Sequence, residues 1–139
     1  MEELDELFWK NQRLLVISPH ADDETFGCAG TMAKVKSYGG KVYVILVSVG
    51  TVVQFTPDGK KKIRGEERED EFKRVMEFLK VDDIDILYRD AETHLRLDSI
   101  PRLELISRIE TDSKLSLQKL NPTMIALPAI SYNQDHEAV

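Results

Sequence analysis

The sequence predicts an α/β protein in which helices pack on a mainly parallel sheet to give three layers. Short apolar runs rich in Val, Ile and Leu alternate with helical segments along the chain. Such alternation is typical of parallel sheets, whose strands are joined by right-handed helical crossovers. The 139 residues suffice for one hydrophobic core but not comfortably for two, so we expect a single domain over residues 1–139.

The first part of the chain contains two apolar runs separated by a helical segment. Residues 13–18 (RLLVIS) are followed by Pro19 and are interpreted as a buried strand. A helix is expected over residues 29–38 because two glycines follow it as a stop signal. Residues 41–49 (KVYVILVSV) are rich in β-branched side chains and predict the second strand.

The rest of the chain repeats this alternation. Residues 50–62 predict a loop with a turn at a Pro-Asp-Gly sequence, and residues 64–79 predict a helix because apolar side chains recur at the helical spacing. Residues 84–88 predict the third strand. A long helix is expected over residues 99–120, where a serine can cap its start and Asn-Pro follows its end, and the fourth strand over residues 123–127.

Polar residues follow two of these strands, and the topology predicts that they meet. In the common doubly wound order 3-2-1-4, the first and fourth strands are neighbours, and ligands bind in the crevice at their C-terminal ends. The loop after the first strand holds His20, Asp22 and Asp23, and the loop after the fourth holds Asn133, Asp135 and His136. We therefore expect these two groups to lie together at a ligand-binding edge.

The residue types in the two loops favour a divalent metal. Adjacent ionised carboxylates repel each other, so such a group needs a cation or a shared proton. His20 and Asp23 from one loop and His136 from the other form a two-histidine, one-carboxylate set, which suits catalytic Zn²⁺ and also Fe²⁺. Asp22 then stays free to take a proton from the attacking water, and Asp135 is suited to hold an imidazole in the required tautomer.

Three other side chains have simpler interpretations. Glu24 either holds the loop through backbone N–H groups or binds the metal. Cys28 is expected to be a small packed residue rather than a ligand. His94, which lies among polar neighbours, is expected to be exposed to solvent or to face a substrate, and not to be a ligand.

Composition excludes several classes of partner. The net charge of −6 and a pI near 5.1 argue against nucleic acid and anionic membranes, both of which bind basic surfaces. Cys28 is the single cysteine, which excludes an internal disulfide and fits a reducing compartment. With no signal-peptide pattern and no apolar run as long as a membrane span, we expect a cytoplasmic protein that acts on a small molecule.

Beyond these observations, the sequence resembles a known family. Residues 19–30 (PHADDETFGCAG) resemble the PHxDDExxGCGG signature of the LmbE/PIG-L family of zinc-dependent N-deacetylases. Residues 132–136 (YNQDH) resemble its second motif, usually written HxDH, and Arg68 with Glu71 resembles its R-x-x-E helix. The resemblance runs from about residue 13 to the end of the chain, and the first signature is long and specific.

Members of this family have a Rossmann-like fold and remove acetyl groups from N-acetylglucosaminyl compounds. The zinc ligands that the resemblance implies are His20, Asp23 and His136. It implies Asp22 as the general base and Asp135 as a carboxylate that supports the site. Arg68 becomes a candidate for contact with an acetamido-sugar substrate or for support of the loop.

The sequence departs from the family pattern in three places. Ala29 replaces a glycine, which is a mild change because alanine is a good helix former. Asn133 stands where the pattern most often has His, a residue credited with stabilising the oxyanion; asparagine can still donate a hydrogen bond there, but it cannot titrate. The chain stops three residues after His136, so we expect an N-terminal portion of a longer domain. An exposed apolar sheet edge would then favour a homo-oligomer.

The leading hypothesis is a metal-dependent hydrolase that removes an acetyl group from an N-acetylated amino sugar or its conjugate. The same site would serve an amidase that cleaves a larger N-acyl group. Two alternatives involve no catalysis: a metal-binding module, and a module that binds nucleotide through Gly27 and Gly30. These glycines lack the G-x-G-x-x-G spacing, and the neighbouring carboxylates would repel phosphate.

Overall fold

The central sheet of the protein has four parallel strands in the order β5-β2-β1-β6. The computed structural model describes residues 2–129 and 131–139. The four strands are β1 (Arg13–His20), β2 (Lys41–Ser48), β5 (Asp83–Tyr88) and β6 (Met124–Ala126). This is the predicted order 3-2-1-4, and the predicted α/β fold class is confirmed.

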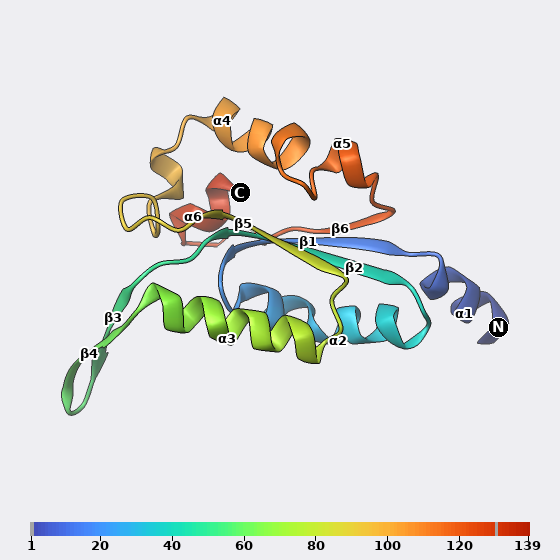
Figure 1. The fold of residues 1–139 in the computed structure, drawn as a ribbon, viewed down its shortest axis with the longest axis horizontal. Helices are drawn as coiled ribbons and strands as arrows, with labels where there is room; N and C mark the ends of the chain where they lie inside the picture. The colour runs from blue at the N-terminus through green and yellow to red at the C-terminus, as the bar shows by residue number, and fades with distance from the viewer. Residues whose placement is uncertain (1, 130) are drawn as a thin grey trace.

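Helices cover both faces of the sheet and complete the three layers (Figure 1). One face is covered by α2 (Asp23–Ser37) and α3 (Gly65–Phe78). The other is covered by short segments, which are η1 (Leu97–Ser99), α4 (Arg102–Ser107), η2 (Arg108–Asp112) and α5 (Leu117–Leu120). Helices α1 (Glu2–Lys10) and α6 (Gln134–Ala138) lie near the two ends of the chain. Among the described residues, no helix combines the length and apolar character needed to cross a bilayer.

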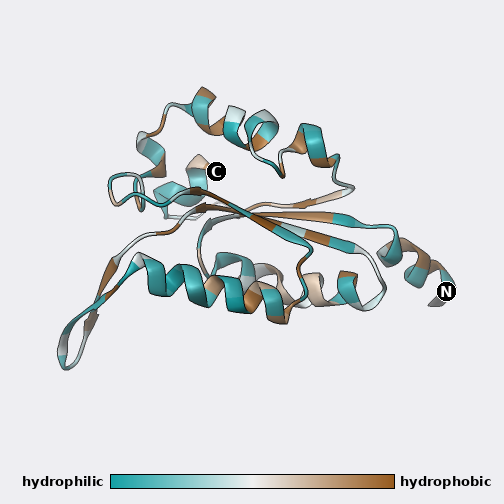
Figure 2. Ribbon diagram, in the orientation of Figure 1, coloured by the Kyte–Doolittle hydropathy of each residue, from teal (hydrophilic) through white to brown (hydrophobic). Residues whose placement is uncertain are grey.

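The hydrophobic core lies on both faces because successive side chains of a strand point to opposite sides. Leu14 and Val16 of β1 pack in one cluster with Phe72 of α3. Leu15 and Ile17, one residue out of phase, pack in the other cluster with the segments on the opposite face. Strands that are buried on both faces have continuous apolar runs in their sequence. Figure 2 shows hydrophobic residues, in brown, along the strands of the central sheet.

Helix α2 begins at Asp23, six residues before the expected start. Asp22 has φ 104° and ψ −28°, a left-handed conformation that separates the extended chain of β1 from the helix. Asp23 and Glu24 occupy the first turn, where negative charge complements the helix dipole. Gly27 and Gly30 lie inside the helix, so the phosphate loop required by the nucleotide-binding alternative does not form.

The segment expected to be a loop over residues 50–62 contains an antiparallel hairpin instead. Strand β3 (Val52–Thr56) pairs with β4 (Gly59–Ile63), and the hairpin projects from the body of the protein (Figure 1). The turn itself was predicted correctly, and Gly59 adopts φ 126° there. The strands were missed because three of the five residues of β4 are lysines, which hide any apolar alternation.

The prediction of one long helix over residues 99–120 is wrong, because α4 continues directly into η2 and ends at residue 112, and a turn separates it from the short α5. Side chains compete with the backbone ladder here. The Thr111 hydroxyl donates to the Ser107 carbonyl at 2.9 Å. The Ser113 hydroxyl accepts from the Leu115 N–H at 3.0 Å and donates to Asp85 at 2.6 Å. These bonds end the helical path after residue 112.

Candidate metal centre

Three side chains meet at the C-terminal ends of β1 and β6. His20 is the last residue of β1, Asp23 is the first residue of α2, and His136 lies on α6. Because β1 and β6 are adjacent and parallel, the segments that follow them emerge at the same edge of the sheet. The topology thus brings together two loops that lie far apart in the sequence, as predicted.

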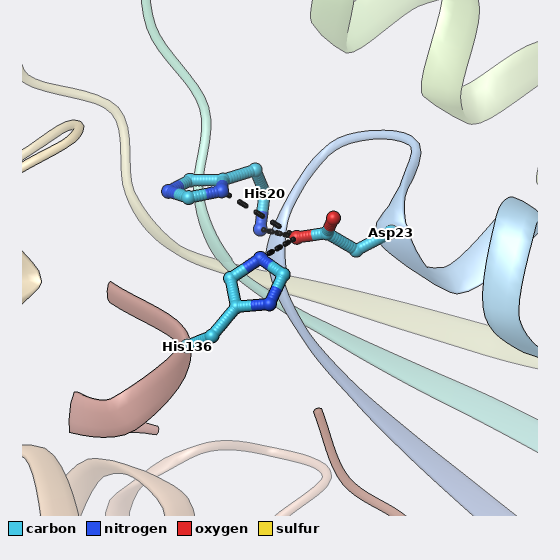
Figure 3. Close-up of side chains that lie close together, drawn as sticks. All are labelled: His20, Asp23 and His136. Carbon is cyan, nitrogen blue, oxygen red and sulfur yellow. Dashed lines mark hydrogen bonds and ion pairs between the residues drawn. The ribbon is translucent and has the colours of Figure 1, made fainter. Parts of the chain in front are cut away.

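The three side chains point toward one another, as Figure 3 shows. Asp23 Oδ2 lies 3.4 Å from His20 Nδ1 and 3.1 Å from His136 Nε2, and it also accepts from the His20 backbone N–H at 3.1 Å. One ligand atom from each residue lies within 4.8 Å of the others. Two atoms bound to a tetrahedral zinc ion lie roughly 3.4 Å apart. The spacing and the donor types therefore fit a divalent ion.

Asp135 occupies the position expected of a carboxylate that orients His20. Its Oδ2 lies 2.6 Å from His20 Nε2, and its Oδ1 accepts from the Leu97 N–H at 2.8 Å. The side chain is only 1% exposed. With its carboxylate facing Nε2, that nitrogen carries a hydrogen, so Nδ1, which faces Asp23, is the ring nitrogen that could bind a metal after losing its own proton. Metal-binding histidines are commonly oriented in this way.

The charges of this group perturb one another. Burial disfavours the charged form of His20, but the hydrogen bonds that its ring donates to the carboxylates of Asp23 and Asp135 outweigh burial and raise the pKa of His20. Burial likewise opposes ionisation of Asp23, yet the hydrogen bond from His20 and the charge of His136 hold the pKa of Asp23 below its usual value. Protons balance these charges, and a divalent ion would displace them on binding.

Asp22 is the N-cap residue of α2, but its side chain makes no capping hydrogen bond to the helix. Partial burial of its carboxyl group, together with the charge of Asp23, raises the pKa of Asp22. Asp22 lines a cavity of about 200 Å³ with Arg68. Asp23 and His136 line a neighbouring cavity of about 410 Å³. The two adjacent carboxylates therefore face different surroundings.

Glu24 holds the loop, which is the first of its two interpretations. Its Oε2 accepts from the Ser18 hydroxyl at 3.0 Å and from the Asp22 N–H at 3.1 Å, and its Oε1 accepts from Thr25 at 2.8 Å. Burial raises the pKa of Glu24, which is 2% exposed. The bond to the Asp22 N–H stabilises the left-handed backbone at that residue.

Arg68 supports the loop rather than reaching away from it. Its Nη2 donates to the Ala21 carbonyl at 3.2 Å, and its Nη1 donates to the Gly50 carbonyl at 3.2 Å and to His94 Nε2 at 2.9 Å. Of the two roles considered for Arg68, loop support is therefore the one that its contacts favour.

For His94, the expectation of exposure to solvent is wrong, because the side chain is buried. Only 5% of His94 is exposed. Burial and the adjacent Arg68 charge lower the pKa of His94 to about 4, so its ring is neutral near pH 7. The polar residues on either side of it in sequence gave no signal of burial, which comes from contacts with β2 and α3.

Asn133 and Cys28 lie at the margin of the site. Asn133 is the N-cap of α6, and its Oδ1 accepts from the Asp135 N–H at 2.9 Å. Its amide NH₂ group is the part that can donate to an oxyanion. Cys28, on α2, is partly buried against one of the two core clusters, as expected for a packed residue.

Asp135→Asn is expected to weaken metal binding by roughly 10–100-fold, the usual cost of losing an outer partner of a metal ligand. Asparagine cannot accept from both the Leu97 N–H and His20 Nε2, so His20 loses its fixed tautomer. Competition with a chelator measures the affinity, and thermal unfolding of the metal-free protein controls for folding. Unchanged affinity would show that Asp135 does not orient His20.

Comparisons with known proteins agree with this fold. The family model PIG-L, GlcNAc-PI de-N-acetylase, matches residues 15–139. No curated protein sequence matches the chain. A conserved protein from Thermus thermophilus is a similar solved structure, with 28% identity and a TM-score of 0.65 over 91% of this chain and 51% of that one.

Two deacetylases are also similar in structure. N,N'-diacetylchitobiose deacetylase from Pyrococcus horikoshii is 24% identical, with a TM-score of 0.62 over 91% of this chain and 46% of that one. The A40926 pseudoaglycone deacetylase is 23% identical, with a TM-score of 0.65 over 92% of this chain and 55% of that one. The chain thus spans about half the length of these structures. Because the family model matches most of its residues, the chain belongs to the PIG-L (LmbE-like) deacetylase family.

Proposed function

We propose that this protein is a metal-dependent hydrolase that removes the acetyl group from an N-acetylated amino sugar of the N-acetylglucosaminyl type, or from its conjugate. The observation that carries the proposal is the meeting of His20, Asp23 and His136 at one edge of the sheet, with Asp135 behind His20. Membership in a deacetylase family supports the reaction class.

The proposed metal ligands are His20 Nδ1, Asp23 Oδ2 and His136 Nε2, and zinc is favoured because its sites use nitrogen and carboxylate ligands. Fe²⁺ suits the same donors. When bound, the ion supplies Lewis-acid activation of water and of the amide carbonyl. Asp135 holds His20 in the tautomer that leaves Nδ1 free for this role.

The proposed proton carrier is Asp22. Its carboxylate takes the proton of the attacking water and later delivers it to the nitrogen of the leaving amine. The raised pKa of Asp22 supports this role, because a general base works best when its pKa approaches the operating pH. Asn133 is the proposed donor to the oxyanion, through its amide NH₂ group.

The cavity beside Asp23 and His136 is large enough for a small-molecule substrate. Its volume is about 410 Å³, within the range of ligand sites. Phe26, Leu127 and Pro128 give it an apolar wall, which suits the face of a sugar ring. The same wall suits a longer acyl chain, so an amidase acting on a larger N-acyl conjugate is the second candidate.

We propose a cytoplasmic location, in keeping with the single cysteine of the chain, and a homo-oligomer. The support for an oligomer is the edge of the sheet at β6. Ile125 and Leu127, which lie at this edge, are both exposed large apolar side chains.

A panel of N-acyl amino sugars, assayed for new primary amine, tests the proposed function. We expect amine release from N-acetylglucosamine derivatives, loss of release with a chelator, and recovery with added zinc. Matched substrates with acetyl and octanoyl groups distinguish the two candidates, because the amidase would release amine faster from the longer acyl group. A protein that binds one metal per chain and releases no amine would instead be a binding module.

A further inference from the structure

A second group of polar side chains lies behind His20 and is separate from the proposed ligands. Its members are Ser48 at the end of β2, Arg68 on α3 and His94 between β5 and η1. Ser48 and His94 are buried, and Ser48 lies beside His20 in the register of the sheet. Three separate segments of the chain thus place polar groups against one metal-binding histidine.

The hydrogen bonds of this group form a chain from Arg68 through His94 and Ser48 to the Pro19 carbonyl. Arg68 Nη1 donates to His94 Nε2 at 2.9 Å, and a guanidinium can only donate, so Nε2 is the unprotonated nitrogen. His94 Nδ1 then carries the hydrogen and donates to the Ser48 hydroxyl at 3.1 Å. The Ser48 hydroxyl donates in turn to the Pro19 carbonyl at 3.2 Å.

The group also reaches the other side of His20. Arg68 Nη2 donates to the Ala21 carbonyl at 3.2 Å. The connected bonds therefore end at the carbonyls of Pro19 and Ala21, the two residues that flank His20. The His94 ring meets the His20 ring edge-on, with centroids 5.6 Å apart and an interplanar angle of 88°. Both the backbone and the ring of His20 are thus in contact with this group.

The backbone near His94 is shaped to admit its ring. A Cβ added at Gly50 would lie 2.7 Å from three atoms of His94, a distance that real Cβ contacts do not reach. The Gly50 carbonyl accepts from Arg68 at 3.2 Å. A residue with a side chain at this position would therefore displace His94.

We propose that His94 is a positioning residue for the metal centre, joining Arg68 to Ser48 so that His20 is held on both sides in the orientation that directs its Nδ1 at Asp23. The inference rests on the proposed metal-dependent function and assigns His94 no contact with substrate. Removing its ring takes the donor from the Ser48 hydroxyl and the acceptor from one Arg68 N–H, so the side chains that bind the two carbonyls around His20 are no longer linked to each other.

His94→Leu is expected to weaken zinc binding by about 10–100-fold, as for other outer partners of metal ligands, and to alter the visible absorption of the Co²⁺-substituted protein, which reports coordination geometry. His94→Gln should recover most of the affinity, because its amide oxygen can accept from Arg68. Ser48→Ala, which loses only the branch to Pro19, should give a smaller loss and remains decisive if His94→Leu does not fold.

Ser113→Ala is the matched control. Ser113 is also a buried serine with a hydrogen bond to a neighbouring side chain, but it lies in the opposite layer and contacts Asp85. We expect it to lower the unfolding temperature without changing zinc affinity or the Co²⁺ spectrum. If His94→Leu, or Ser48→Ala in its place, behaves like this control, the inference is overturned.

The wild-type protein separates this inference from the proposed function. If the wild-type protein binds zinc and releases amine, and His94→Leu binds zinc with equal affinity, only the positioning role of His94 is overturned. A wild-type protein that binds no metal overturns both.

Discussion

His136→Ala is expected to lose its metal under conditions in which the wild-type protein retains one ion per chain. His136 supplies the single proposed ligand from the second loop, and its Nε2 lies 3.1 Å from Asp23 Oδ2. Loss of an outer partner already costs roughly 10–100-fold in affinity, so loss of a ligand should cost at least about 100-fold. Elemental analysis and chelator competition measure the effect, and amine release should fall with metal content.

The neighbouring Glu137 provides a control on the same short helix. Glu137 is exposed and belongs to no proposed ligand set, so Glu137→Ala should retain the metal. Metal-free His136→Ala should unfold at nearly the wild-type temperature, because its imidazole lies at the margin of the core and is partly exposed. Full retention of metal in His136→Ala would remove it from the ligand set.

The order of the sheet was predictable because the central strands are buried on both faces. Leu14 to Ile17 alternate between the two core clusters, and both faces are apolar, so the strand is visible as an unbroken apolar run. The hairpin at β3 and β4 has no such buried face, because most of its residues are exposed.

In the candidate site, too, some residues could be placed from the sequence and others could not. His20 and Asp23 could be placed near His136 because parallel strands deliver their following loops to one edge. Arg68 was named through the family resemblance alone, and the burial of His94 could not be predicted, since its partners are side chains from other segments. Such contacts depend on the packed geometry of α3 against the sheet, which no local pattern specifies.

The left-handed residue at the end of β1 explains how two adjacent carboxylates acquire different environments. Asp22 has φ 104°, after which Asp23 enters α2 and directs its Oδ2 back to the His20 N–H and ring. Glu24 holds this geometry by accepting from the Asp22 N–H. Asp23 thereby contacts the two histidines, while the Asp22 side chain makes no capping hydrogen bond.

Asp22→Asn is expected to reduce kcat by about 10²–10⁴-fold while leaving the metal bound, because general acid–base catalysis contributes that much. Asparagine keeps the shape of the side chain and tolerates the left-handed backbone, so folding should be preserved. Wild-type kcat/KM should fall at acid pH as the base becomes protonated. Because the pKa of Asp22 is raised, this fall should begin at a higher pH than it would for an ordinary aspartate. This acid limb should disappear in Asp22→Asn.

Asn133→Ser separates the proton carrier from the oxyanion donor. Serine still accepts from the Asp135 N–H as an N-cap but lacks the amide NH₂, so kcat should fall by roughly 10²–10³-fold, as for one lost oxyanion donor, with the acid limb retained. The alternative for Asp22 is that its side chain serves only as a helix cap, in which case Asp22→Asn would have little effect. The structure does not favour this alternative, because the Asp22 side chain makes no capping hydrogen bond. Near-wild-type turnover in Asp22→Asn, measured with metal content unchanged, would exclude Asp22 from the proton transfer.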